Sequence, residues 1–150
     1  DTNTTAIIVQ GLVSVGEGDA DMVHDALNYL TDAQLANGFS FQPGSGAIAD
    51  ANSTGIVVQA LISAGEDPGA VKWQNVTGAL SAFQLPDGSY SYMLDPLESN
   101  LFASVQALPA AAGQAFPIRA PGATNLTSLP TCTPAELESA THEAELACAA

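Results

Sequence analysis

The chain contains almost no positive charge. Its 150 residues include only Lys72 and Arg119 as basic side chains against sixteen Asp or Glu, which gives a formal net charge of −14. Such a surface repels phosphate backbones and anionic lipid headgroups at long range. The sequence therefore excludes nucleic acid as a partner and disfavours anionic membranes.

Long apolar runs are missing as well. Gln, Ser, Gly or Pro interrupts each apolar stretch before it reaches the length of about 18 to 20 residues that a membrane-spanning helix needs. Apolar residues nevertheless make up 47% of the chain, which is enough for a hydrophobic core in one domain. We therefore expect a folded domain that does not insert into a membrane.

Metal ligands are scarce. The histidines are His24 and His142, the cysteines are Cys132 and Cys148, and none of them has the spacing of a zinc site. The Asp87 turn offers one carboxylate, which is too few for calcium. We expect no metal, no cofactor and no enzymatic activity.

What the chain does have is a repeated string. Residues 1–17 read DTNTTAIIVQGLVSVGE, and residues 50–66 read DANSTGIVVQALISAGE. A weaker copy at residues 100–113 places Gln106 only 47 positions after Gln59, so a short deletion or a frayed register separates it from the second copy. A period near 50 residues indicates a repeat protein.

Each repeat predicts a helical hairpin. Residues 4–15 are apolar on nearly all sides, which is typical of an enclosed inner helix, with Asn3 or Thr4 as its cap and Gly16 at its end. Residues 21–34 show the period of an amphipathic outer helix. A turn at Asn37 and Gly38 follows, and then a short extended piece with two aromatic residues.

The second repeat predicts the same order. An inner helix is expected over residues 53–64, an outer helix over residues 71–84 and a turn at Asp87 and Gly88. A shift of 50 positions superimposes the outer-helix pairs Val23/Trp73, Ala26/Val76, Leu30/Leu80 and Ala33/Phe83. A third inner helix, over residues 101–108, should be cut short or bent at Pro109, and no outer helix follows it.

The remaining residues predict a linker and one more helix. Residues 114–133 are rich in Pro, Gly and Ala, whereas residues 134–150 begin with a capping box and continue as strong helix formers. A straight helix would hold Cys132 and Cys148 about 20 Å apart, too far for a disulfide. A fold-back near Thr141, pairing between chains and free thiols therefore remain three open alternatives.

The hairpins resemble a known superfamily. Both end in Gln-X-X-(Asn/Asp)-Gly followed by aromatics, at Gln34 to Phe39 and at Gln84 to Tyr90. Helix pairs of this kind resemble the α/α-toroid repeat of terpene cyclases and protein prenyltransferases, and the segment beginning at Gln106 is similar to the last helix of bacterial surface members. The resemblance covers residues 1–113 and implies an all-α, toroid-like fold of about two and a half helix pairs, an incomplete ring.

The functional residues of that superfamily are not matched. The Asp-X-Asp-Asp acid of squalene cyclases is absent, and the nearest string, Asp19 to Asp21, is typical of a solvated loop. The zinc ligand set of the prenyltransferases and a thioester-forming Cys-Gly-Glu-Gln string are absent too. Fold alone does not define function, and these absences favour a role without catalysis.

Five residues are candidates for binding a ligand or partner. Gln10, Gln59 and Gln106 recur inside apolar helices, where an amide could line a cavity, although bonding to a neighbouring backbone group is the preferred interpretation. Tyr90 and Tyr92 could form a sugar platform together with other aromatics, although repeat-matched aromatics are more often core wedges.

Candidate glycosylation sites point outside the cell. Four Asn-X-Ser/Thr triplets occur, at Asn3, Asn52, Asn75 and Asn125. The first two compete with a helix-capping role, so Asn75 and Asn125 are the candidates. Together with the shortage of Lys and Arg, they suggest an acidic extracellular or cell-surface protein, either processed or part of a longer chain.

These observations predict a structural or interaction module without catalysis. It would associate with other protein subunits, with itself or with the rest of its parent chain, because about half a toroid leaves helix faces uncovered. One alternative is a detached half of a toroid enzyme or of a small-ligand carrier, such as a cobalamin binder. A second alternative is carbohydrate binding through the tyrosine-bearing loops.

Overall fold

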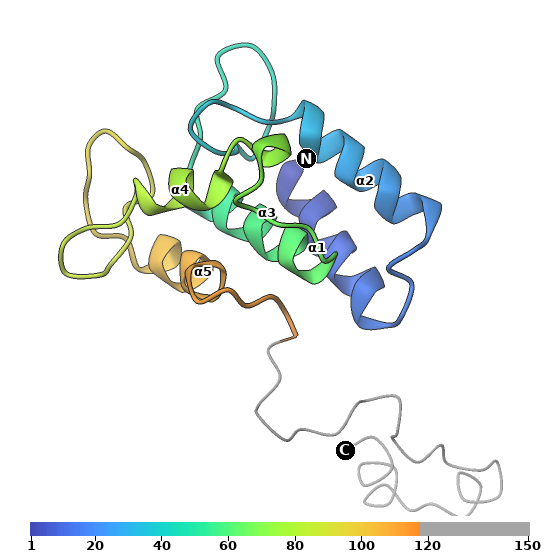
Figure 1. Ribbon diagram of the computed structural model, residues 1–150. Helices are drawn as coiled ribbons and strands as arrows, with labels where there is room; N and C mark the ends of the chain where they lie inside the picture. Colours follow the sequence, from blue (N-terminus) through green and yellow to red (C-terminus); the bar gives the residue numbers. More distant parts are fainter. Residues whose placement is uncertain (118–150) are drawn as a thin grey trace, which may run out of the picture. The chain divides into compact units, whose positions relative to one another are not determined.

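The computed structural model describes residues 1–117, and all their regular elements are helical (Figure 1). This confirms the all-α class and its helical hairpins. Within the same residues, extended backbone forms only isolated bridges in turns. The elements are α1 (Thr2–Ser14), α2 (Asp21–Asp32), α3 (Ala51–Ser63), the 3-10 turn η1 (Val71–Trp73), α4 (Val76–Ser81) and α5 (Leu101–Ala111).

The three inner helices lie side by side. Figure 1 shows α3 between α1 and α5, and it packs against both of them. Helix α2 covers α1 on the outside, and α4 covers α3 and touches α5. The large buried side chains that join these layers are Leu30, Leu61, Trp73, Leu80 and Phe83. The predicted order of inner and outer helices is therefore confirmed.

Each inner helix begins at an acidic or amide cap. The carboxylate of Asp1 accepts a hydrogen bond from the Thr4 amide at 2.8 Å, and Asp50 does the same for α3. Asn100 caps α5. Asp1 and Asp50 are thus the caps of the first two inner helices, and the prediction of Asn3 or Thr4 as the first cap is wrong, because α1 starts two residues earlier.

The loops after the outer helices connect neighbouring inner helices. In the first repeat, the Phe39 carbonyl accepts from the Asp50 amide, and the Phe39 amide donates to the Thr54 hydroxyl at 3.0 Å. The Phe41 carbonyl accepts from the Thr2 amide at 3.1 Å. One short segment therefore holds the starts of α1 and α3 in a fixed register.

The second repeat forms the equivalent bonds. The Tyr90 amide donates to the Ser104 hydroxyl at 2.9 Å, the Tyr90 carbonyl accepts from the Asn100 amide, and the Tyr92 carbonyl accepts from the Ala51 amide. The starts of α3 and α5 are thus joined as those of α1 and α3 are. The repeat is consequently a repeat of backbone connections as well as of sequence.

The second outer helix is broken, contrary to the prediction of one helix over residues 71–84. Gln74 and Asn75 adopt left-handed backbone angles, with φ of 48° and 52°, and separate η1 from α4. The Asn75 side chain then caps α4 by accepting from the Gly78 amide. Asn tolerates this conformation better than most residues, which explains why the break falls there.

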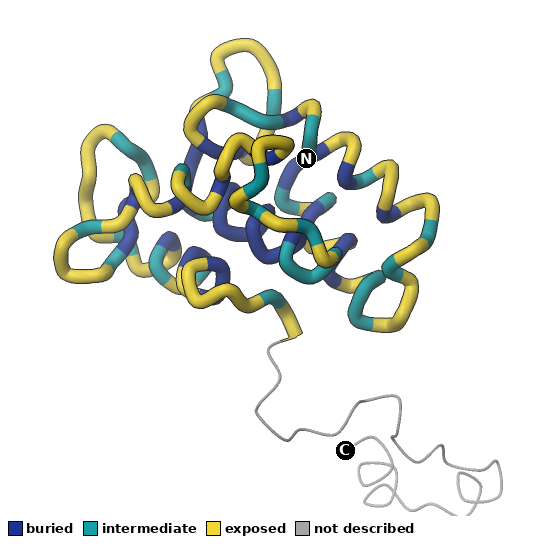
Figure 2. Tube along the Cα trace, viewed as in Figure 1, coloured by how far each residue is buried: buried dark blue, intermediate teal, exposed yellow. Residues whose placement is uncertain are grey.

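Two further expectations need correction. The third inner helix is not cut short: α5 continues past Pro109 to Ala111, although the proline has no amide hydrogen to donate to the preceding turn. The prediction that the first inner helix is enclosed is also wrong. Figure 2 shows continuous burial along α3, whereas α1 carries exposed residues including Ile7 and Ile8.

Candidate functional site: the uncovered flanks of the repeat

Each inner helix has a forward flank, formed by the first, fifth and eighth residues after its cap. In α1 and α3 the following inner helix covers this flank. The flank of α1 is Thr2, Ala6 and Val9, and that of α3 is Ala51, Gly55 and Val58, all of them buried. In α5 the flank is Leu101, Val105 and Leu108, which are 76%, 62% and 62% exposed.

The opposite side of each inner helix is its rear flank, formed by the third, seventh and tenth residues after the cap. The preceding inner helix covers it in α3, where it is Ser53, Val57 and Ala60. It is equally buried in α5, where it is Ala103, Ala107 and Ala110. In α1 the rear flank is Thr4, Ile8 and Gly11, and all three residues are exposed.

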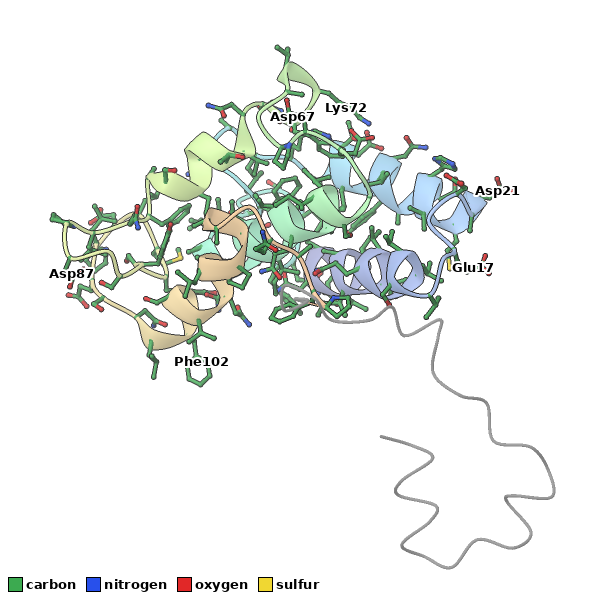
Figure 3. All side chains as sticks on the ribbon, turned by 60° about the horizontal axis from the view of Figure 1, so that its bottom comes forward. Glu17, Asp21, Asp67, Lys72, Asp87 and Phe102 are labelled. Atoms are coloured by element: carbon green, nitrogen blue, oxygen red, sulfur yellow. The ribbon has the colours of Figure 1, made fainter. Side chains whose placement is uncertain are left out.

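The forward flank of α5 is apolar, whereas the rear flank of α1 combines Ile8 with Gly11 and with Thr4, whose hydroxyl donates to the Asp1 carboxylate at 2.9 Å. Neither α1 nor α5 contains an ionisable side chain, whereas α2 alone holds three aspartates. Phe102 extends the α5 flank and projects away from the helices, as Figure 3 shows. Its side chain is 74% exposed. An apolar strip of this kind on a strongly acidic chain is a candidate contact surface.

The glutamines do not form one row. Because the caps lie at positions 1, 50 and 100, Gln106 aligns with Ile56, and Pro109 takes the place of Gln59. The Gln59 side chain donates to the Gln106 carbonyl at 2.8 Å. It therefore joins α3 to α5, which agrees with the backbone-bonding interpretation of that residue.

Gln10 has a different partner. Its side-chain oxygen accepts from the Phe116 amide at 3.0 Å, so residues beyond α5 return to α1. Between them lies a cavity of about 480 Å³ lined by Ile7, Gln10, Gly11, Ser14, Phe116 and Pro117. The sequence interpretation placed residues 114–117 in a linker and missed this cavity. Phe116, a large apolar residue in that stretch, is the signal that could have indicated a buried contact.

The two candidate tyrosines have unlike surroundings. Tyr90 is 3% exposed and belongs to the core, and burial raises the pKa of its hydroxyl. Tyr92 is 43% exposed, and the negative charge of Asp50 raises its pKa. Phe39 and Trp73 are buried as well. Of the aromatics that follow the outer helices, Tyr92 and Phe41, which is 48% exposed, are therefore the ones that face solvent.

Of the candidate glycosylation and disulfide residues, Asn75 alone lies within the described part of the chain. Asn75 is exposed at the start of α4. Asn125, Cys132 and Cys148 lie outside the described residues, as do the expected end of the linker and the helix over residues 134–150. The three alternatives for the cysteines thus stay predictions.

Residues 1–117 hold no cluster of three or more His, Cys, Asp or Glu side chains able to bind a metal ion. Among the helices of this part of the chain, none is long and apolar enough to cross a membrane. Comparisons of the chain with protein-family models, curated proteins and solved structures found no match. The uncovered flanks of α1 and α5 are consequently the strongest functional feature.

Proposed function

We propose that residues 1–113 form a non-catalytic interaction module, which associates with other subunits or with further repeats of its parent chain. One observation carries this proposal. The forward flank is buried wherever an inner helix follows, and in α5 the same positions hold large apolar side chains that are more than half exposed. The forward flank of α5 is therefore a contact surface that no following helix covers within the described residues.

The energetics favour association at this surface. Burying apolar area contributes about 25 cal/mol per Å², so covering a Leu, Val, Leu and Phe strip contributes several kcal/mol before the cost of association. Exposed single apolar residues are ordinary, but a contiguous strip along one helix is typical of an interaction site. The rear flank of α1 adds a second uncovered surface, on which Ile8 is the large apolar side chain.

The native mass tests this proposal. Light scattering of material from the natural source, with reductant present, should give a mass well above the 15.2 kDa of this chain. Mass spectrometry of the denatured material then distinguishes an assembly of short chains from a longer covalent chain. A native monomer of 15.2 kDa would contradict the proposal.

The proposal includes a location outside the cell or on its surface. The exposed side chain of Asn75 supports it, because the amide nitrogen is free for a glycan while the oxygen accepts from the Gly78 amide at 3.3 Å. Intact cells treated with a membrane-impermeant amine reagent should yield labelled Lys72. Labelling only after cell lysis would argue against this location.

A small-ligand carrier is the second candidate. The cavity between α1 and Phe116 favours it, because its volume of about 480 Å³ falls within the usual range for small-molecule sites and Gln10 contributes an amide to an apolar lining. Native mass spectrometry of source material should then show a bound apolar molecule that Ile7→Trp displaces. An unliganded native mass would contradict the carrier.

A further inference from the structure

We infer that a second copy of this chain covers the forward flank of α5 with the rear flank of its own α1, in a head-to-tail contact. This inference rests on the proposed function and names its partner. The contact would be a third example of an interface that the chain already forms twice. Inside the chain, α1 is followed by α3, and α3 is followed by α5.

The internal interface defines the register of the contact. A Cβ atom at Gly55 would lie 3.1 Å from the Ala107 Cα atom, and Gln59 donates to the Gln106 carbonyl. The fifth residue after one cap therefore faces the seventh residue after the next. The same register places Leu101, Val105 and Leu108 opposite Thr4, Ile8 and Gly11 of the second copy.

The side chains of Leu108 and Gly11, the last facing pair of this register, are complementary in size. Inside the chain, Val58 and Ala110 occupy the equivalent places, and between copies Leu108 would meet Gly11. Leu is one methylene larger than Val, and Gly is one methyl smaller than Ala. A Cβ atom at Gly11 would meet nothing within 4 Å, and Gly11 borders the cavity that Phe116 and Pro117 also line, so the Leu108 side chain would enter the edge of that cavity. The pairs Leu101/Thr4 and Val105/Ile8 are larger than their counterparts inside the chain, which predicts a wider spacing between the two helices than between α3 and α5.

Charge restricts where two copies can meet. Each chain carries a net charge of −14, so most contacts between copies would bring like charges together. The two flanks reduce this cost because α1 and α5 hold no ionisable side chain, and the Asp1 carboxylate, bonded to the Thr4 hydroxyl, is the charge that stands at the edge of the rear flank. Added salt should therefore strengthen the association by screening the remaining repulsion, whereas an ion-pair interface would weaken. The contact is heterologous, so it produces a ring if it closes and a filament if it does not.

A mixing experiment tests the geometry. The full chain is compared with Leu108→Glu, which blocks the forward flank, and with Ile8→Glu, which blocks the rear flank, by sedimentation velocity with reductant present. Each variant alone should be monomeric at concentrations at which the parent chain is larger. An equimolar mixture should form a one-to-one dimer and nothing larger, because each variant keeps the flank that the other has lost. Val71→Glu, at a 95% exposed residue outside both flanks, is the control and should associate normally.

A second variant separates association from folding. Gly11→Ala should raise the stability of α1, since alanine favours helix over glycine, and should weaken association at least threefold by filling the space opposite Leu108. A symmetric pairing of two α5 helices would make Ile8→Glu silent. That variant would then dimerise alone, and the mixture would contain no dimer that includes Leu108→Glu, which would overturn the inference. A parent chain that stays monomeric at every concentration would overturn it too. If native material is nonetheless assembled, the proposed function survives with a different partner.

Discussion

Helices α3 and α5 occupy equivalent places in successive repeats, yet only α3 is covered on both flanks. Their forward flanks differ in size. Helix α3 presents Ala51, Gly55 and Val58, whereas α5 presents Leu101, Val105 and Leu108. Both helices are uncharged, so apolarity does not tell which one is enclosed. The small side chains on α3 permit the close approach of α5. The large side chains on the forward flank of α5 would hold a covering helix at a greater distance.

A buried charge gives the largest expected contrast between these helices. Val58→Glu places an unpaired carboxylate where the side chain is 1% exposed, and it should cost more than about 4 kcal/mol of unfolding free energy. Leu108→Glu, at the equivalent position of α5, should change the stability of the dilute monomer by less than about 1 kcal/mol. Urea unfolding followed by circular dichroism measures both. Equal losses would mean that α5 is covered within the chain itself.

The close approach at Gly55 is the next point of contrast. Gly55→Val adds branched atoms against the backbone of Gln106 and Ala107 and should cost about 3 kcal/mol. The matched variant Gly11→Val, in α1, meets open space and should be nearly neutral in a monomeric Leu108→Glu background. The same unfolding measurement applies. A neutral Gly55→Val would contradict the close packing of α3 against α5.

Much of this fold could be predicted from the sequence, because the repeat superimposes caps, turns and apolar positions. The pairs Val23/Trp73 and Leu30/Leu80 are buried in both outer layers as expected. The break in the outer helix was not predicted, because Asn75 permits left-handed angles without requiring them, and Gln74, which shares them, gives no such signal. Helical periodicity alone does not distinguish one helix from two that share a face.

The candidate site was predicted only in outline. The sequence indicated uncovered helix faces but aligned the third copy by Gln106, which concealed the equivalence of Leu101 and Leu108 with small buried residues. Aligning by the caps Asp50 and Asn100 reveals it at once. The cavity at Phe116 depends on a long-range contact with Gln10, and no local pattern encodes such a contact.

The hydroxyl of Thr54 offers a smaller and more local contrast. It is buried and accepts from the Phe39 amide, so Thr54→Val should leave that amide without a partner and cost about 2 kcal/mol. Thr5 is its equivalent in α1, and its hydroxyl donates only to the Asp1 carbonyl. Thr5→Val should therefore cost about 0.5 kcal/mol or less. Amide exchange at Phe39 should accelerate in the first variant alone, and unchanged exchange would refute the role of this bond.

The smallest predicted effect concerns the acidic end of the loop after α3. The Glu66 carboxylate accepts from the Trp73 indole at 2.8 Å and lies 3.2 Å from the Lys72 ammonium group. The indole bond, opposed in part by burial and assisted by Lys72, holds the pKa of Glu66 below its ordinary value of 4.5. The first repeat has the acid Glu17 at the equivalent place, but Val23 stands where Trp73 stands, so no indole can donate there.

Because the folded pKa of Glu66 is lowered, its contribution to stability is complete above pH 4.5 and disappears as the pH falls through the folded value. Glu66→Gln removes the charge and should cost about 0.5 kcal/mol at pH 7, the size expected for a partly exposed ion pair. The difference between parent and variant should shrink at acidic pH. Glu17→Gln should show no such difference at either pH. Trp73 is the single tryptophan of the chain, so its fluorescence can follow both the titration and the unfolding. A parent-to-variant difference that persists at acidic pH would show that the indole bond does not depend on the charge of Glu66.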